Sequence, residues 1–125
     1  MPETTEYASE KGIIVITYTG KVTIEEVKEA TMKAIAIQKE KQTDRVLIDA
    51  SDLTAAPSIT DMWALVQSYP EIGAPRRTRL AAVRPVVPDK ADVTGFFEVI
   101  CQNRCYNAKG FHTREAAEEW VRSDR

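Results

Sequence analysis

The most constraining feature of this chain is a short apolar run, Val46-Leu47-Ile48, which leads through polar residues into a helical pattern. A run this short, bounded by Asp44-Arg45 and Asp49, is typical of an interior parallel strand covered on both faces. The residues beyond it repeat with helical spacing and bring five apolar side chains onto one face: Ile59, Met62, Trp63, Val66 and Tyr69. A strand, a loop over Asp49–Pro57 and an amphipathic helix indicate one unit of an α/β sheet.

The same alternation of strands and helices runs through the rest of the chain. The patterns predict an edge strand at residues 4–9, a strand at 13–18, a helix from the Thr23–Glu26 capping box to about 39–43, the strand at 46–48, a helix that Pro70 ends, a strand at 80–83, a helix between 89 and 107, a short strand at 111–112 and a last helix capped by Thr113. This order predicts an α/β fold with a mixed, largely parallel sheet of four to five strands and covering helices. One domain should span residues 1–125.

Size and charge exclude several classes of function. The chain has 125 residues and a net charge of −2, with 17 basic against 19 acidic side chains. This balance provides no global field to attract nucleic acid or anionic lipid. The sequence also has no signal-peptide pattern and no apolar run long enough for a membrane span. We therefore expect a cytoplasmic protein without nucleic-acid binding.

Polar side chains are predicted to gather where two neighbouring strands end. If the strands at 46–48 and 80–83 are parallel, their carboxyl ends share one edge of the sheet, where ligands bind in open α/β folds. The candidate ligand-binding residues at this edge are Asp49, Ser51, Asp52, Ser58 and Arg84. A structural alternative explains the same residues, with Asp49 paired to Arg84 and Ser58 capping a helix. We expect a polar depression rather than a working active site, because Ser58 has no base beside it.

Signatures of catalysis and of metal binding are absent from the sequence. It contains no glycine-rich phosphate loop, no nucleophile elbow and no HExxH motif. Cys101, Cys105 and the single His112 match no standard zinc spacing, and a fourth ligand is missing. Buried thiols are the simpler interpretation of the cysteines. We predict no enzyme activity, no metal and no cofactor.

Large apolar side chains exceed what one helical stripe can bury. The candidate interface residues are Met62, Trp63, Phe96 and Phe97. Such a surplus indicates a homodimer contact or an apolar ligand groove, and helix packing within the chain explains it equally well. The basic residues Arg76, Arg77 and Arg79 are interpreted as solvated surface.

Several local patterns together resemble a known family. GIIVITYTGKVTIEEV reads as strand, turn and helix, RVLIDASDL as the central strand and loop, RLAAV as the next strand, and KGFHTREAAEEWV as a short strand before a last helix. In these patterns and in their order the chain resembles the SpoIIAA-like proteins, whose fold is close to STAS domains and to CRAL-TRIO lipid-binding domains. The resemblance covers nearly the whole chain.

The resemblance implies a fold and a type of function. Phosphorylated STAS proteins carry an Asp-Ser-Ser-Gly motif at the start of the helix after the central strand; here only Ser58 occupies a comparable place, so no phosphoswitch is expected. The resemblance implies a non-enzymatic regulatory or binding module for a partner protein or a small apolar or anionic ligand, lipids included. The alternatives are a small enzyme acting on an anionic substrate at the loop after the central strand, and a structural homodimer without a ligand.

Overall fold

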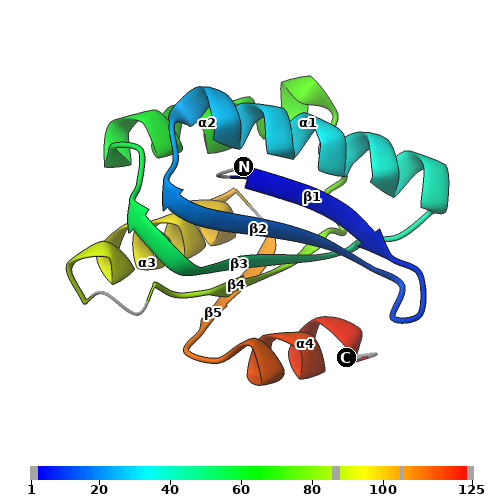
Figure 1. Ribbon diagram of the computed structural model, residues 1–125. Helices are drawn as coiled ribbons and strands as arrows, with labels where there is room; N and C mark the ends of the chain where they lie inside the picture. Colours follow the sequence, from blue (N-terminus) through cyan, green and yellow to red (C-terminus); the bar gives the residue numbers. More distant parts are fainter. Residues whose placement is uncertain (1–2, 86–87, 105, 124–125) are drawn as a thin grey trace.

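The computed structural model describes residues 3–85, 88–104 and 106–123, apart from the side chains of 88–94 and 96. Its elements alternate strand and helix after an initial hairpin (Figure 1). In chain order they are β1 (Glu3–Ala8), β2 (Ile13–Lys21), α1 (Ile24–Lys41), β3 (Arg45–Ala55), α2 (Ile59–Ile72), β4 (Arg79–Val83), α3 (Pro88–Asn103), β5 (Asn107–Phe111) and α4 (Arg114–Arg122). None of the helices in this part of the chain has the length and apolar character needed to cross a membrane.

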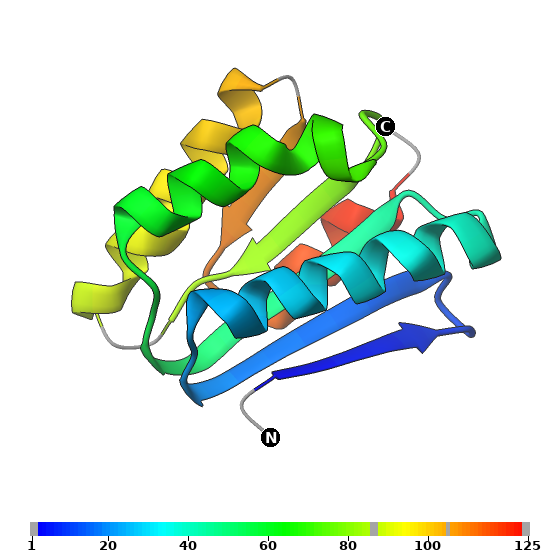
Figure 2. The same cartoon turned by 90° about the horizontal axis from the view of Figure 1, so that it is seen from above.

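The five strands lie side by side in the order in which they occur along the chain. The antiparallel edge strand β1 pairs with β2, and β2, β3, β4 and β5 are mutually parallel. This confirms the predicted mixed, largely parallel sheet. Crossovers between parallel strands are right-handed, and each one here advances by one strand in the same direction. The three crossover helices α1, α2 and α3 therefore cover one face of the sheet, and α4 lies on the other (Figures 1 and 2).

Two apolar clusters lie on either side of the sheet. The larger lies under α1, α2 and α3, where Ile14, Val46 and Leu80 from neighbouring strands meet helical side chains such as Val66. The smaller lies under α4 and contains Ile13, Leu47, Ala81, Val83, Ala117 and Val121. Consecutive residues of each strand alternate between the two clusters because a strand points successive side chains to opposite faces.

Local sequence signals explain where the helices begin. The side chain of Thr23 accepts a hydrogen bond from the Glu26 backbone N–H, and the Glu26 carboxylate accepts one from the Thr23 N–H at 2.8 Å. This is the predicted capping box at the start of α1. Thr113 caps α4 in the same way, by accepting from the Ala116 N–H.

The prediction of a loop directly after Ile48 is wrong, because β3 continues to Ala55. The preceding strand β2 also extends past Gly20, which adopts a left-handed φ of 68°. Thr19 pairs with Asp52 and Gly20 with Leu53 across irregularities in register. Asp49, Ser51 and Asp52 are therefore strand residues, held in place by backbone pairing with β2.

Two further boundaries differ from the prediction. Pro70 lies inside α2, which continues to Ile72 and ends at Gly73, in the left-handed region at φ 89°. The N–H groups of Gly73 and Ala74 both donate to the Tyr69 carbonyl, so the cap holds the turn beyond Pro70. The residues expected to end the third helix instead form β5, which pairs in parallel with β4.

Arg76, Arg77 and Arg79 were predicted to be solvated surface, and for Arg79 this prediction is wrong. Arg79 donates to the backbone carbonyls of Trp120 and Ser123 at 2.9 and 2.7 Å, and its guanidinium lies 4.4 Å from the centre of the Trp120 ring. Arg45 donates to the Arg122 carbonyl. These contacts satisfy carbonyls left free at the end of α4, where positive charge also favours the helix dipole.

Candidate functional site

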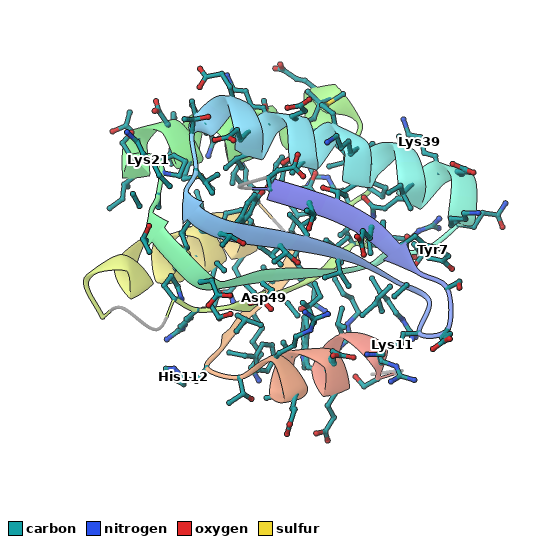
Figure 3. The ribbon with its side chains drawn as sticks, in the orientation of Figure 1. Tyr7, Lys11, Lys21, Lys39, Asp49 and His112 are labelled. Carbon is teal, nitrogen blue, oxygen red and sulfur yellow. The ribbon has the colours of Figure 1, made fainter. Side chains whose placement is uncertain are left out.

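The predicted residues lie near the same end of the sheet, but their side chains do not form a single cluster. β3 and β4 run in parallel, and Asp49 lies opposite Val83, the residue before Arg84. The side chain of Asp49 points toward α4, as Figure 3 shows. One carboxylate oxygen accepts from the hydroxyl and backbone N–H of Ser51, at 2.6 and 3.0 Å. The other oxygen lies 3.3 Å from Arg114 at the start of α4.

The expected ion pair between Asp49 and Arg84 is wrong. Arg84 is paired with Glu98 on α3, with Nη2 of Arg84 3.1 Å from the carboxylate. The physical reason is alternation along β4: Val83 faces α4, so Arg84 points to the opposite face of the sheet. Sharing one end of the sheet was therefore not sufficient to bring these two charges together.

Ser58 and Asp52 lie apart from that pair as well. The Ser58 hydroxyl accepts from the Asp61 backbone N–H at 3.1 Å and caps α2. This is the structural role foreseen for Ser58 at a helix start. Asp52 is exposed near the end of β3. The five predicted residues are thus divided between the two faces of the sheet.

The four predicted interface residues also occupy different environments. Met62 and Phe97 are buried in the core of the chain, where both line the space beneath α2 and α3. Trp63 is 49% exposed. The side chain of Phe96 lies outside the described part of the structure. Among these residues, Trp63 offers apolar surface to the solvent.

A cavity of about 100 Å³ lies between the sheet and helices α1, α2 and α3. Its walls come from β2, β3 and β4 below and from the three helices above. The floor is formed by Ile16, Val46, Ile48 and Leu80. An apolar cavity roofed by helices is the usual form of a small-molecule site.

Small side chains explain why this space stays open. Ala50 on β3 and Ala82 on β4 point into the cavity, and Ala34 on α1 faces them from above. Protein interiors are otherwise packed to crystal-like density, so an alanine at an inward position leaves volume that a leucine would fill. The sequence analysis missed the cavity. The signal that would have revealed it is alanine at inward positions of two adjacent strands and of the helix above them.

The polar groups that line the cavity are hydroxyls and one amide. Gln38 donates to Thr78 at 2.8 Å, and Thr78 donates to the Pro75 carbonyl at 2.6 Å. Tyr69 and Tyr106 meet edge to face, with ring centres 5.5 Å apart, and the Tyr106 hydroxyl donates to the Ala74 carbonyl at 3.1 Å. Burial is the main cause that raises the pKa of Tyr69, so its hydroxyl stays protonated at neutral pH.

Of the two cysteines, Cys101 is among the described residues and offers no reactive thiol, whereas Cys105 lies outside the described part of the structure. Cys101 is fully buried beside Tyr69, and burial raises the pKa of its thiol to about 12. A neutral, enclosed thiol is a poor nucleophile. His112 is exposed just after β5, near the start of α4 (Figure 3), and is not among the residues that line the cavity. Within residues 3–85, 88–104 and 106–123, no three potential ligand side chains lie close enough together to hold a metal.

Comparisons with known proteins identify the fold. No protein-family model matches the chain, and neither does any curated protein. A solved structure does match: an uncharacterized protein of the DUF3478 family, with a SpoIIAA-like fold, from Shewanella loihica PV-4. The two are 17% identical, with a TM-score of 0.57 over 95% of this chain and 91% of the other. At this identity the likeness establishes the fold.

Proposed function

We propose that this chain, whose fold is SpoIIAA-like, is a non-enzymatic module that binds a small apolar molecule in the cavity under α1, α2 and α3. The single observation that supports the proposal is an open space of about 100 Å³ with apolar walls in the centre of the fold. For comparison, an engineered apolar cavity of about 150 Å³ stays dry and binds benzene.

The absence of ionic groups in the walls supports binding rather than catalysis. The walls contain no Asp, Glu, Lys, Arg or His side chain among the described residues. General acid–base chemistry needs a titratable group near neutral pH within reach of the ligand. Burial raises the pKa of the tyrosine hydroxyls instead, and a neutral hydroxyl without a base remains a poor nucleophile.

Filling the cavity tests the proposal directly. In Ala82→Leu the larger side chain occupies the space, whereas Ala116→Leu adds the same volume on the exposed side of α4. We expect cumene to raise the melting temperature of the wild-type protein and of Ala116→Leu, because a ligand that binds only the folded state stabilises it by mass action. Cumene should not stabilise Ala82→Leu.

Two results would contradict this function. Equal stabilisation of Ala82→Leu would show that cumene binds elsewhere. A wild-type protein that no apolar probe stabilises would show that the cavity is not a ligand site.

A homodimer through α2 is the second candidate function. Ile59 and Trp63 lie one turn apart on α2 and are 43% and 49% exposed. Exposed large apolar side chains on one helix face are typical of a contact surface, and a twofold pair is the usual assembly for a small protein. We expect light scattering to give a dimer for the wild type and a monomer for Trp63→Glu. A monomeric wild type at high micromolar concentration would exclude it.

A further inference from the structure

The cavity contains two tyrosine hydroxyls that no described residue engages. Tyr18 comes from β2 and Tyr69 from α2; both line the cavity, and they are 7% and 6% exposed. The other polar groups of the walls are bonded: Tyr106 to Ala74, and Gln38 to Thr78. Among the described residues, the hydroxyls of Tyr18 and Tyr69 donate no hydrogen bond. The two hydroxyls are therefore donors that a ligand in the cavity can engage.

Building on the proposed function, we infer that the ligand is an uncharged molecule of about one ring with a carbonyl or other hydrogen-bond acceptor, which Tyr18 and Tyr69 recognise. Tyr18 and Tyr69 line the same cavity, one from the sheet and one from the helix above it. An acceptor oxygen has two lone pairs, so a ligand in this cavity can accept a hydrogen bond from either hydroxyl.

Charge around the cavity excludes an anionic ligand. The described walls have no cationic side chain that would pair with a buried carboxylate or phosphate, and an unpaired buried charge is strongly disfavoured. Glu3 lies opposite Tyr18 in the register of β1 and β2, and its carboxylate is paired with Lys33 at 3.0 Å, so this lysine is already engaged with an acid.

The size of the cavity limits the apolar part of the ligand. A space of about 100 Å³ is of the order of the cavity that holds benzene, so it accommodates about one ring of the ligand. The alanines on β3 and β4 and the ring of Phe97 leave room for one ring or a short branched chain. An aryl ketone, a small ester or a phenol fits these requirements, whereas the carboxylate of a fatty acid has no cationic partner among the described walls.

A matched series of probes tests this inference. Cumene, acetophenone and benzoate have the same number of non-hydrogen atoms and differ in having no acceptor, a neutral acceptor and an anionic acceptor. We expect acetophenone to bind the wild-type protein roughly three- to tenfold more tightly than cumene, the gain of about one hydrogen bond, and benzoate to bind most weakly. NMR titration of the backbone amides measures the three dissociation constants.

Tyrosine variants test whether the hydroxyls of Tyr18 and Tyr69 donate to the carbonyl oxygen of acetophenone. Tyr18→Phe and Tyr69→Phe remove one hydroxyl each and keep the ring, and each should lower the preference for acetophenone over cumene. Tyr106→Phe is the matched control, because its hydroxyl is bonded to the Ala74 carbonyl and its loss should leave the preference unchanged.

The possible failures are distinguishable. Cumene binding without any preference for acetophenone would overturn the inference and leave the proposed function standing, as would a preference that survives in both Tyr18→Phe and Tyr69→Phe. Benzoate as the tightest ligand would overturn the assignment of a neutral ligand. If none of the three probes binds, the proposed function fails and the inference fails with it.

Discussion

At the scale of single residues, Gly110 on β5 marks the tightest point near the predicted polar edge. A β-carbon added there would lie 2.8 Å from Nε of Arg84 and 3.0 Å from the Glu98 carboxylate. Nε of Arg84 is itself buried without a described partner. The arginine is therefore held between a glycine and an acid, and its position depends on the absence of a side chain at Gly110.

Replacing this glycine should push the guanidinium of Arg84 away from Glu98. We expect Gly110→Ala to lower the free energy of unfolding by about 0.5–2 kcal/mol, because added volume in a filled space strains its neighbours. In an Arg84→Ala background the same change should cost less, because the two Arg84 nitrogens are gone and the Glu98 side chain, no longer paired with Arg84, is free to move away from the added methyl group. Urea denaturation of the two single variants and the double variant gives the coupling free energy. Additive effects would show that Gly110 and Arg84 do not interact.

Arg84 itself should contribute to stability rather than to activity. Its pair with Glu98 is partly exposed to solvent, so we expect Arg84→Ala to cost roughly 0.5–1 kcal/mol. A melting temperature equal to that of the wild type, together with the loss of a measured activity, would instead identify this edge of the sheet as a functional site.

At the scale of elements, the last helix depends on side chains from strands far away in the sequence. α4 has nine residues, which is short for a helix that must form without support. Arg79 at the start of β4 bonds to the carbonyls of Trp120 and Ser123 and stacks over the Trp120 ring. Removing this one side chain therefore removes hydrogen bonds, a cation–π contact and packing together.

We expect Arg79→Met to destabilise the protein by roughly 1–3 kcal/mol, since the carbonyls at the end of α4 lose their donors. Arg77→Met is the matched control, because Arg77 is exposed and pairs with Asp44 on the surface. Hydrogen exchange should show the loss of protection concentrated in residues 114–122. A uniform loss across the sheet, or an equal effect in the control, would contradict this role of Arg79.

The order of elements and the two threonine caps could be predicted, because they depend on short-range periodicity and on capping boxes such as Thr23–Glu26. The extension of β3 to Ala55 could not, since it depends on pairing with a continuation of β2 across register irregularities. Pro70 was wrongly predicted to end its helix, because the residue before a proline usually avoids helical geometry. The helix instead continues to Ile72 and is capped at Gly73. The candidate site was mostly missed. Which face Arg84 points to, and how much space Ala50 and Ala82 leave, depend on how strands and helices pack together.

At the scale of the whole molecule, an ion pair joins the N-terminal hairpin to the C-terminal helix. Lys11, in the turn between β1 and β2, contacts Glu118 on α4, and Arg114 lies 3.4 Å from the same carboxylate. The hydrogen bond from Lys11 is the main cause that lowers the pKa of Glu118. A carboxylate whose pKa is lower in the folded state stabilises that state above its unfolded pKa, and this contribution is lost as the pH falls through the folded value.

Glu118→Gln should therefore destabilise the protein more at about pH 7 than at about pH 3.5. Denaturant unfolding at both values measures the two differences from the wild type. Glu119→Gln, a neighbouring exposed position, serves as the control and should show no such change with pH. A constant difference for Glu118→Gln at both pH values would show that the pair with Lys11 contributes nothing in solution.

The sequential order of the strands has a consequence for how the protein is made. Each strand pairs with the one synthesised just before it, so the sheet can grow in step with the ribosome, without waiting for a distant partner. Helices α1, α2 and α3 cover one face as it grows, but the other face receives its cover only when α4 emerges. Until then Leu47 and Ala81 remain uncovered on a nascent sheet. We expect this interval to be the window in which chaperones bind the chain and in which truncated products aggregate.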